Sequence, residues 1–179
     1  ADSVDLANRT TGFDMTRVLD NPDVRTPLMM YLFHRVDERL DGSPAIIVID
    51  EGWKALDDDV FVGRIRDWEK TIRKRGGIVG FVTQNAEDAL ASRIAGAIVE
   101  QSATQIFTAN ARARAEDYVD GFGLTAHEFD LIRSLPESAH CFLIKHGHES
   151  VVVRLNLSGE GDLLTILSGR EASIRRLDA

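Results

Sequence analysis

The sequence predicts an α/β protein built on a layered, mostly parallel sheet. Apolar runs of strand length alternate along the chain with amphipathic segments of helix length, which is the pattern of a β–α–β fold. The runs "AIIVID", "GIVGFVT" and "CFLI" are continuous rather than alternating, as expected where helices cover both faces of a parallel sheet. No internal repeat, low-complexity segment or long linker interrupts the 179 residues, so a single domain or most of one is expected.

Six segments are expected to be strands. The last alternates in character and follows the turn-like stretch "HGHES", so it is expected to be an antiparallel edge hairpin strand. In chain order the expected strands are Thr11–Met15, Ala45–Asp50, Ile78–Thr83, Thr104–Phe107, Cys141–Ile144 and Val151–Leu155.

Helices are expected between these strands. The first has Thr26 as its N-cap and Pro27 at its first position, and Gly42 ends it. The second begins near Val60 and ends at the Gly76–Gly77 pair, a C-cap signal. Three more are expected at Ala86–Glu100, Ala111–Asp120 and Thr125–Ser134, the last opened by the capping-box pair Thr125 and Glu128.

Composition narrows the possible functions. The chain has 21 basic and 29 acidic side chains, a net charge of −8, which argues against broad nucleic-acid binding. The single cysteine, Cys141, cannot form an internal disulfide. The polar N-terminus lacks the apolar core of a secretory signal, and no apolar run approaches the ~18 residues of a membrane span. A cytosolic protein is therefore expected.

Two adjacent carboxylates, Asp50 and Glu51, follow the apolar run "AIIVI" directly. Ligands gather at the carboxyl ends of strands in open parallel sheets. Apolar residues followed by Asp-Glu have the form of a Walker B motif, in which the aspartate holds Mg²⁺ and the glutamate polarises the attacking water. The alternative is a solvated strand end before a helix whose N-terminus favours negative charge.

Polar and basic residues accompany this pair. Thr83 and Gln84 end the next expected strand, where they could contact a γ-phosphate or orient water; the alternative for Gln84 is a loop cap. Upstream, "KTIRKRGG" places Arg73 and Arg75 at a helix end, either as an arginine finger for an adjacent subunit's nucleotide or as cations favoured by the helix dipole.

A phosphate-binding loop of the form G-x-x-x-x-G-K-[ST] is not found, because the sequence contains no Gly-Lys dipeptide. The residues therefore supply part of a nucleotide site, and the isolated chain is expected to be inactive toward ATP.

Five blocks resemble the C-terminal ATPase domain of the CagE/TrbE/VirB family, the large ATPases of type IV secretion systems known as the fourth VirB component. They are "TTGFDMTRVLDNPDVRTPLMMYLFHRVDERLDG", "IIVIDEGWKALDD", "WEKTIRKRGGIVGFVTQNAEDAL", "EQSATQIFTAN" and "LNLSGEGDLLTILSGR". The resemblance covers essentially the whole chain. It implies a RecA-like P-loop NTPase core, with residues 1–179 forming its C-terminal portion from Walker B onward and the Walker A segment upstream of Ala1.

The resemblance also implies roles for individual residues. Asp50 matches the Walker B aspartate on the Mg²⁺ side, Glu51 the catalytic glutamate, and Gln84 the glutamine that ends the following strand. Arg73 is the first choice for the arginine that acts on a neighbouring subunit, and Arg75 the second.

The remaining expectations concern the later part of the chain and its partners. Asn110 matches the end of a later family motif near the nucleotide, with a turn residue as the alternative. Residues 169–179 form a basic tail that is either solvated or in contact with a neighbouring subunit or anionic lipid. Through the resemblance, ATP and Mg²⁺ are the expected cofactors, and other secretion components, a hexamer and the inner membrane the expected partners.

Two rival interpretations stay open. One is a DNA-translocating coupling protein of the FtsK/HerA-like group, which a basic pore loop would favour; the sequence offers only the "RKR" cluster. The other is a non-catalytic interaction domain that docks on secretion-system partners.

Overall fold

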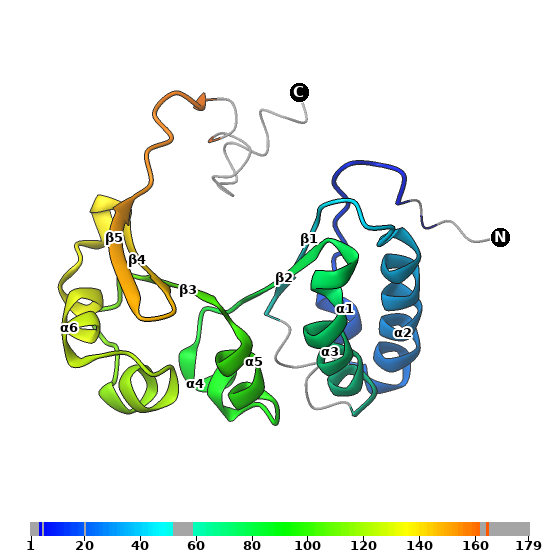
Figure 1. Ribbon diagram of the computed structural model, residues 1–179, viewed down its shortest axis with the longest axis horizontal. Helices are drawn as coiled ribbons and strands as arrows, with labels where there is room; N and C mark the ends of the chain where they lie inside the picture. Colours follow the sequence, from blue (N-terminus) through cyan, green and yellow to red (C-terminus); the bar gives the residue numbers. More distant parts are fainter. Residues whose placement is uncertain (1–3, 5, 20, 52–58, 162–163, 165–179) are drawn as a thin grey trace. The chain divides into compact units, whose positions relative to one another are not determined.

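In the computed structural model, the described residues are 4, 6–19, 21–51, 59–161 and 164. The chain divides into two units, Ala1–Ser102 and Ala103–Ala179 (Figure 1). The basic tail expected at 169–179 lies outside the described residues. Both units combine helices with a sheet, so the α/β class is confirmed.

The sheet of the first unit consists of two parallel strands, β1 (Ala45–Asp50) and β2 (Gly77–Val82). They run in register from the pair Ala45 and Gly77 to the pair Asp50 and Val82. The first strand has the bounds expected from the sequence. Because the strands are parallel, the residues that follow them meet at one edge of the sheet and the residues that precede them meet at the other.

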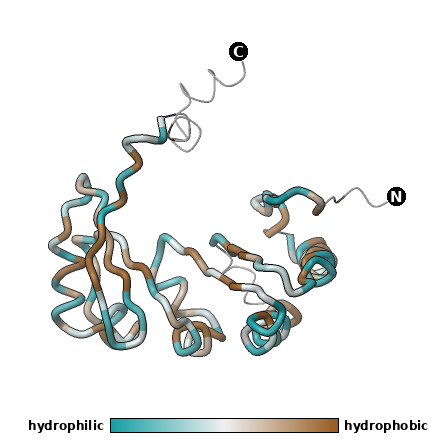
Figure 2. The backbone as a smooth tube through the Cα atoms, turned by 45° about the horizontal axis from the view of Figure 1, so that its top comes forward, coloured by the Kyte–Doolittle hydropathy of each residue, from teal (hydrophilic) through white to brown (hydrophobic). Residues whose placement is uncertain are grey.

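Helices α2 (Pro22–Arg39), α3 (Asp59–Thr71) and α5 (Ala95–Gln101) contribute to the core beneath this sheet. Phe33 of α2 packs against the rings of Phe61 and Trp68 of α3, with centroids 5.1 and 4.6 Å apart. The strands bring Ile47 and Val79, among others, to the same cluster. Hydrophobic stretches along the strands are visible in Figure 2.

The other face of this sheet is exposed within the described part of the chain, which differs from the expectation of cover on both faces. Its residues are Ile46 (75% exposed), Val48 (61%), Ile78 (64%) and Val82 (47%). Exposed apolar side chains grouped on one sheet face are typical of a surface that packs against further protein.

Two helix expectations in the first unit need correction. Helix α2 starts at Pro22, five residues earlier than expected, because the side chain of Asn21 accepts from the N–H of Asp23 and caps it. The helix expected at Ala86–Glu100 is two short helices, α4 (Ala86–Ala91) and α5. The break falls at Ser92, whose backbone is extended and whose residue type favours caps over helix interiors.

The prediction of a strand at Thr11–Met15 is wrong. These residues form no strand, and the short helix α1 (Thr16–Leu19) follows them. The carboxylate of Asp14 accepts a hydrogen bond of 3.0 Å from the N–H of Thr16. A local bond of this kind competes with strand pairing, and Gly12 and Asp14 both have low strand propensity.

The second unit is a three-stranded antiparallel sheet with helices. Its strands follow the order β3 (Thr104–Thr108), β4 (Cys141–His146) and β5 (Glu149–Arg154). The hairpin of β4 and β5 confirms the expected antiparallel element. The apolar run at 141–144, expected in a parallel sheet, is instead the central strand of this antiparallel sheet. A strand that is flanked on both sides and packed against α6 is also continuously apolar, so the apolar run alone does not distinguish the two arrangements.

Helix α6 (Ala126–Ser134) begins at the expected capping box, in which Thr125 and Glu128 bond to each other's backbone N–H. The helix expected at Ala111–Asp120 is instead a π-helical turn, η3 (Glu116–Gly121), in which the N–H of Phe122 bonds to the carbonyl of Asp117.

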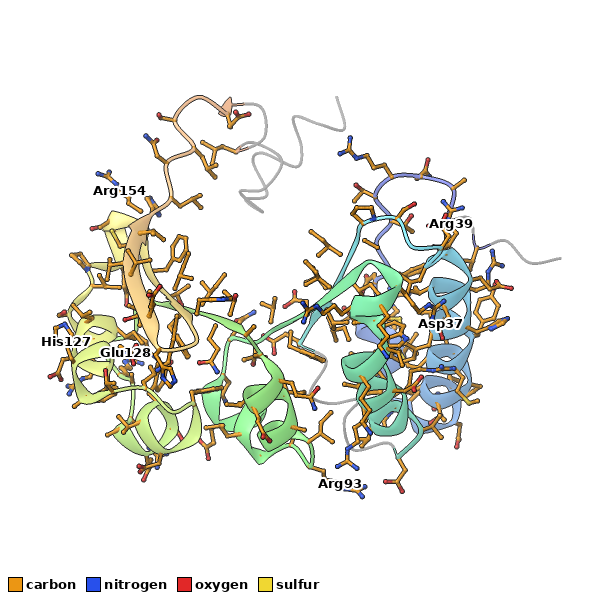
Figure 3. The ribbon with its side chains drawn as sticks, in the orientation of Figure 1. Asp37, Arg39, Arg93, His127, Glu128 and Arg154 are labelled. Atoms are coloured by element: carbon orange, nitrogen blue, oxygen red, sulfur yellow. The ribbon has the colours of Figure 1, made fainter. Side chains whose placement is uncertain are left out.

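The carboxylate of Glu128 is 4% exposed and lies 2.9 Å from Nζ of Lys145 on β4 (Figure 3 labels Glu128). Burial by itself raises the pKa of this carboxyl. Hydrogen bonds from the backbone N–H of Thr125 and from the side chains of Lys145, Ser150 and Thr125 outweigh burial and lower the pKa to about 2. The pair therefore ties α6 to β4 as an ion pair.

Candidate nucleotide site at the sheet edge

The carboxyl edge of β1 and β2 brings together four of the residues expected to form a site. Asp50 is the last residue of β1, and Glu51 follows it; Thr83 and Gln84 follow β2. Asp50 is paired with Val82 in the sheet, so the two strand ends are level. The acidic and polar residues that the sequence placed on different strands therefore lie side by side in the fold.

Glu51 and Gln84 are in direct contact. The N–H of Gln84 donates a hydrogen bond of 2.8 Å to Oε1 of Glu51. In addition, the N–H of Glu51 donates to the carbonyl of Val82 at 3.0 Å, which continues the sheet pairing one residue past β1. Glu51 is thus held through its backbone and one carboxylate oxygen. Its second oxygen, Oε2, has no hydrogen-bond partner within the described residues.

The backbone of Glu51 is in the left-handed region, with φ of +50°. Residues other than glycine rarely adopt this conformation, which costs about 1 kcal/mol or more. Here it ends β1 and turns the side chain toward the end of β2. A strained backbone of this kind is more common at functional sites than at ordinary strand ends.

Thr83 and Gln84 differ in how they are held. The Thr83 hydroxyl donates to the carbonyl of Asn85 at 3.0 Å and accepts from its N–H at 3.1 Å, so it closes a tight turn. The side chain of Asn85 then caps α4 by accepting from the N–H of Glu87 at 3.0 Å. Gln84 lies between these two fixed residues with its side chain exposed.

The donor set at this edge fits Mg²⁺. This ion prefers carboxylate oxygens and usually takes one or two of them together with substrate phosphates and water. Asp50 is exposed at the strand end and supplies such a carboxylate. Within the described residues, no group of three or more His, Cys, Asp or Glu side chains could hold a metal ion by itself. An ion at this edge could take its remaining oxygen ligands from water and from the phosphates of a bound nucleotide.

The two arginines lie at the opposite edge. The 3-10 turn η2 (Ile72–Arg75) directly precedes Gly76 and β2, and the carbonyl of Gly76 accepts from the N–H of Ala45 at 3.1 Å. Six-residue strands with a rise of about 3.3 Å per residue separate the two edges by roughly 17 Å. Arg73 and Arg75 are thus too far from Glu51 to act on a nucleotide bound beside it in the same chain.

The two arginines also differ from each other. The side chain of Arg73 is exposed and makes no hydrogen bond or ion pair within the described part of the chain. In contrast, Nη1 of Arg75 lies 2.8 Å from Oδ1 of Asp37 on α2 and forms an ion pair with it. The sequence interpretation missed Asp37, because its partners follow it in the chain by 27 to 38 residues and no local pattern marks them.

Asn110 lies in the second unit, where both polar atoms of its side-chain amide are hydrogen-bonded. Its Nδ2 donates to the hydroxyl of Tyr118 at 3.1 Å, and its Oδ1 accepts from the N–H of Arg112 at 2.9 Å. Its own N–H bonds to the carbonyl of Ile132 on α6. These contacts give Asn110 a structural role inside this unit, whatever else it contacts.

Comparison with known proteins gives the class to which this chain belongs. The family described as the TraG P-loop domain matches residues 4–160. The chain therefore belongs to the TraG P-loop domain family, which confirms the P-loop α/β fold expected from the sequence.

Its relatives carry the names of type IV secretion proteins, which confirms the resemblance noted in the sequence. The chain is 51% identical over 174 residues to type IV secretion system protein virB4 of Bartonella quintana, covering 97% of this chain and 22% of that protein. It is 44% identical to type IV secretion system protein PtlC of Bordetella pertussis, covering 92% of this chain and 20% of that protein. The chain thus spans about a fifth of the length of these relatives.

A solved structure shares the fold. VirB4 of Thermoanaerobacter pseudethanolicus superimposes with a TM-score of 0.60 at 19% identity, over 72% of this chain and 35% of that one. Among the described helices of the present chain, none combines the length and apolar character needed to cross a membrane.

Proposed function

We propose that this chain is the C-terminal part of the ATPase domain of a type IV secretion motor and supplies the catalytic edge of its ATP site. The observation that carries the proposal is the contact between Glu51 and Gln84 beside Asp50, at the carboxyl ends of parallel strands. Membership of a P-loop family and relatives named virB4 and PtlC support it.

Glu51 is the residue that orients the attacking water. Its Oε1 is fixed by the N–H of Gln84, so the carboxylate has one orientation and offers Oε2 to a water molecule. A fixed carboxylate needs no reorganisation when it accepts a hydrogen bond or proton from that water, which lowers the barrier to in-line attack on a γ-phosphate.

Asp50 is the residue that would hold Mg²⁺ with the nucleotide, where the ion would neutralise charge on the phosphate oxygens. Thr83 shapes the turn from which Gln84 is presented, so the Gln84 amide is the part of this turn that can contact the phosphate or water. Asn110 is included as a further nucleotide-side residue on the family resemblance alone.

Arg73, with Arg75 as the second candidate, serves the nucleotide of an adjacent subunit. The support for this is the separation of the two sheet edges, since a cation at the amino edge can complete only a site outside its own strand pair. The proposal therefore includes a ring-shaped oligomer, a hexamer by the family resemblance, that works with other secretion components on the cytoplasmic side of the inner membrane. The motor would energise pilus biogenesis and substrate transfer.

ATP turnover of the full-length protein tests this proposal. We expect Mg²⁺-dependent hydrolysis that falls at least about 100-fold in Asp50→Asn, because the exposed carboxylate at the strand end is lost. The matched control is Asp88→Asn, an exposed aspartate on α4. Turnover that is unchanged in Asp50→Asn would contradict the proposal and favour the non-catalytic interaction domain, whereas strong stimulation by duplex DNA would favour the coupling-protein interpretation.

A further inference from the structure

One carboxylate, that of Asp37, joins three elements of the first unit. It lies on α2 and is only 17% exposed (Figure 3). Its Oδ1 accepts from Nε1 of Trp68 at 2.8 Å and from Nη1 of Arg75 at 2.8 Å, and its Oδ2 lies 3.0 Å from Nη1 of Arg64. Two of these donors are on α3 and the third is on the η2 turn. Charged hydrogen bonds in a partly buried place are stronger and better defined than exposed ones.

Arg75 is also bound to the end of α2 through its other nitrogen. Nη2 donates to the backbone carbonyls of Asp37 and Leu40, the latter at 3.3 Å. The last carbonyls of a helix lack partners inside the helix and carry partial negative charge, so a guanidinium is a favourable cap. The fork of Arg75 is thus occupied by one carboxylate and two carbonyls, all from α2 or its C-terminal end.

The turn is fixed on its other side by glycine. Gly76 has φ of +76°, and a Cβ there would lie 2.6 Å from the carbonyl oxygen of Gly42. The carbonyl of Gly76 also receives the N–H of Ala45. The η2 turn is therefore held by Arg75 against α2 and by Gly76 against the start of β1, while Arg73, two residues earlier, extends into solvent.

We propose that Asp37 and Arg75 are positioning residues that set the direction of Arg73, and that Arg73 alone contacts the neighbouring nucleotide. This inference rests on the proposed function and narrows it, because it removes Arg75 from the candidates for direct contact. An arginine that stabilises a transition state depends on its placement, and a shift of about 1 Å can cost about 100-fold in rate.

A double-mutant cycle in the full-length protein separates positioning from direct action. We expect Arg73→Ala to lower kcat by on the order of 1,000-fold, as removal of an arginine finger does. Arg75→Lys keeps the charge but loses the fork, and Asp37→Asn keeps an acceptor for Trp68 but loses the charge. Each should lower kcat about 10- to 100-fold with KM for ATP unchanged.

The informative measurement is the effect of these two changes when Arg73 is already alanine. If Arg75 and Asp37 act only through Arg73, neither Arg75→Lys nor Asp37→Asn lowers kcat further in that background. Arg64→Gln is the matched control: it removes a different guanidinium from the same carboxylate, on α3 and outside the turn, and should change kcat less than about threefold.

Several outcomes overturn the inference. Losses in kcat that multiply in the Arg73→Ala background would mean that Arg75 acts directly. A lower Tm with kcat unchanged in both Arg75→Lys and Asp37→Asn would mean that the network is structural only. Failure of the proposed function would be recognised by a different result. In that case the wild-type protein would show no Mg²⁺-dependent ATP hydrolysis, or Asp50→Asn would hydrolyse ATP as fast as the wild type.

Discussion

The backbone N–H of Gln84 bonds to Oε1 of Glu51 at 2.8 Å, and this contact between residues 33 apart in the sequence joins the ends of two parallel strands. It fixes a carboxylate whose own backbone is in the left-handed region. The glutamate is therefore held in an orientation that a relaxed residue at a strand end would not adopt.

The first prediction concerns the backbone strain at Glu51. Glu51→Ala and Glu51→Gly both remove the carboxylate and its bond to Gln84, but only glycine adopts φ of +50° without strain. We expect the Gly variant to be more stable than the Ala variant by about 1 kcal/mol. Urea unfolding followed by tryptophan fluorescence measures the difference, and equal stabilities would mean that Glu51 is not strained.

The second prediction concerns the close contact of Gly76 with the loop before β1. A Cβ at this position would lie 2.6 Å from the Gly42 carbonyl oxygen and 2.9 Å from that of Ser43, at a φ unfavourable to alanine. We expect Gly76→Ala to destabilise the first unit by about 2 kcal/mol or more.

The control for Gly76 is Gly63→Ala. Gly63 lies inside α3, and a Cβ there meets nothing within 4 Å, so alanine should stabilise the helix by about 0.5–1 kcal/mol. Urea unfolding should therefore give opposite signs for the two substitutions. A Gly76→Ala protein as stable as the wild type would contradict the packing described for the η2 turn.

The third prediction is a pH dependence from Glu128. Its pKa is lowered from 4.5 to about 2 in the folded chain, so its stabilising contribution is complete above pH 4.5 and is lost as the pH falls from 4.5 toward 2. At about 1.4 kcal/mol per pKa unit, the contribution is on the order of 3 kcal/mol.

Hydrogen exchange at the α6 amides measures this effect against Glu128→Gln, which does not titrate. The stability difference between the wild type and Glu128→Gln should shrink as the pH falls through that range. A difference that stays constant from pH 6 to pH 2 would show that the Glu128 carboxyl has the same pKa folded and unfolded.

The fourth prediction is the cost of removing the cation from this pair. Lys145→Met leaves the buried Glu128 carboxylate without its ion-pair partner and should destabilise the second unit by about 3–5 kcal/mol. Loss of Lys145 also raises the pKa of Glu128, because Lys145 is one of the groups that lower it. The control is Lys70→Met, at an exposed lysine on α3, which should change stability by less than about 0.5 kcal/mol. Similar losses of stability in Lys145→Met and Lys70→Met would mean that the ion pair of Lys145 and Glu128 does not stabilise the second unit.

Much of the fold could be predicted from local patterns. β1 has its expected bounds, the Thr125–Glu128 capping box starts α6 as expected, and Gly76 ends the segment that begins at α3. What failed was decided by distant contacts or by competing caps. The direction of β4 depends on its partners β3 and β5, which a continuously apolar run does not specify. The Asp14 carboxylate accepts from the N–H of Thr16, the first residue of α1, where a strand was expected.

The clustering of the candidate site residues could be predicted only where strand ends determine it. Asp50, Glu51, Thr83 and Gln84 follow from parallel pairing, because level strand ends bring their next residues together. The contacts of Asp37 could not be predicted in this way. Its three donors come from α3 and η2, whose placement against α2 is a property of the folded unit.

The most direct test of the account is a single turnover of ATP by the full-length protein with Glu51→Gln. This change keeps the size of the side chain and an oxygen for the N–H of Gln84, but it removes the carboxylate that orients water. We expect ATP to bind and remain uncleaved, with γ-phosphate release slowed at least about 100-fold, while Glu100→Gln, an exposed glutamate on α5, cleaves at the wild-type rate. Cleavage by Glu51→Gln at the wild-type rate would contradict the assignment of this sheet edge as the catalytic site.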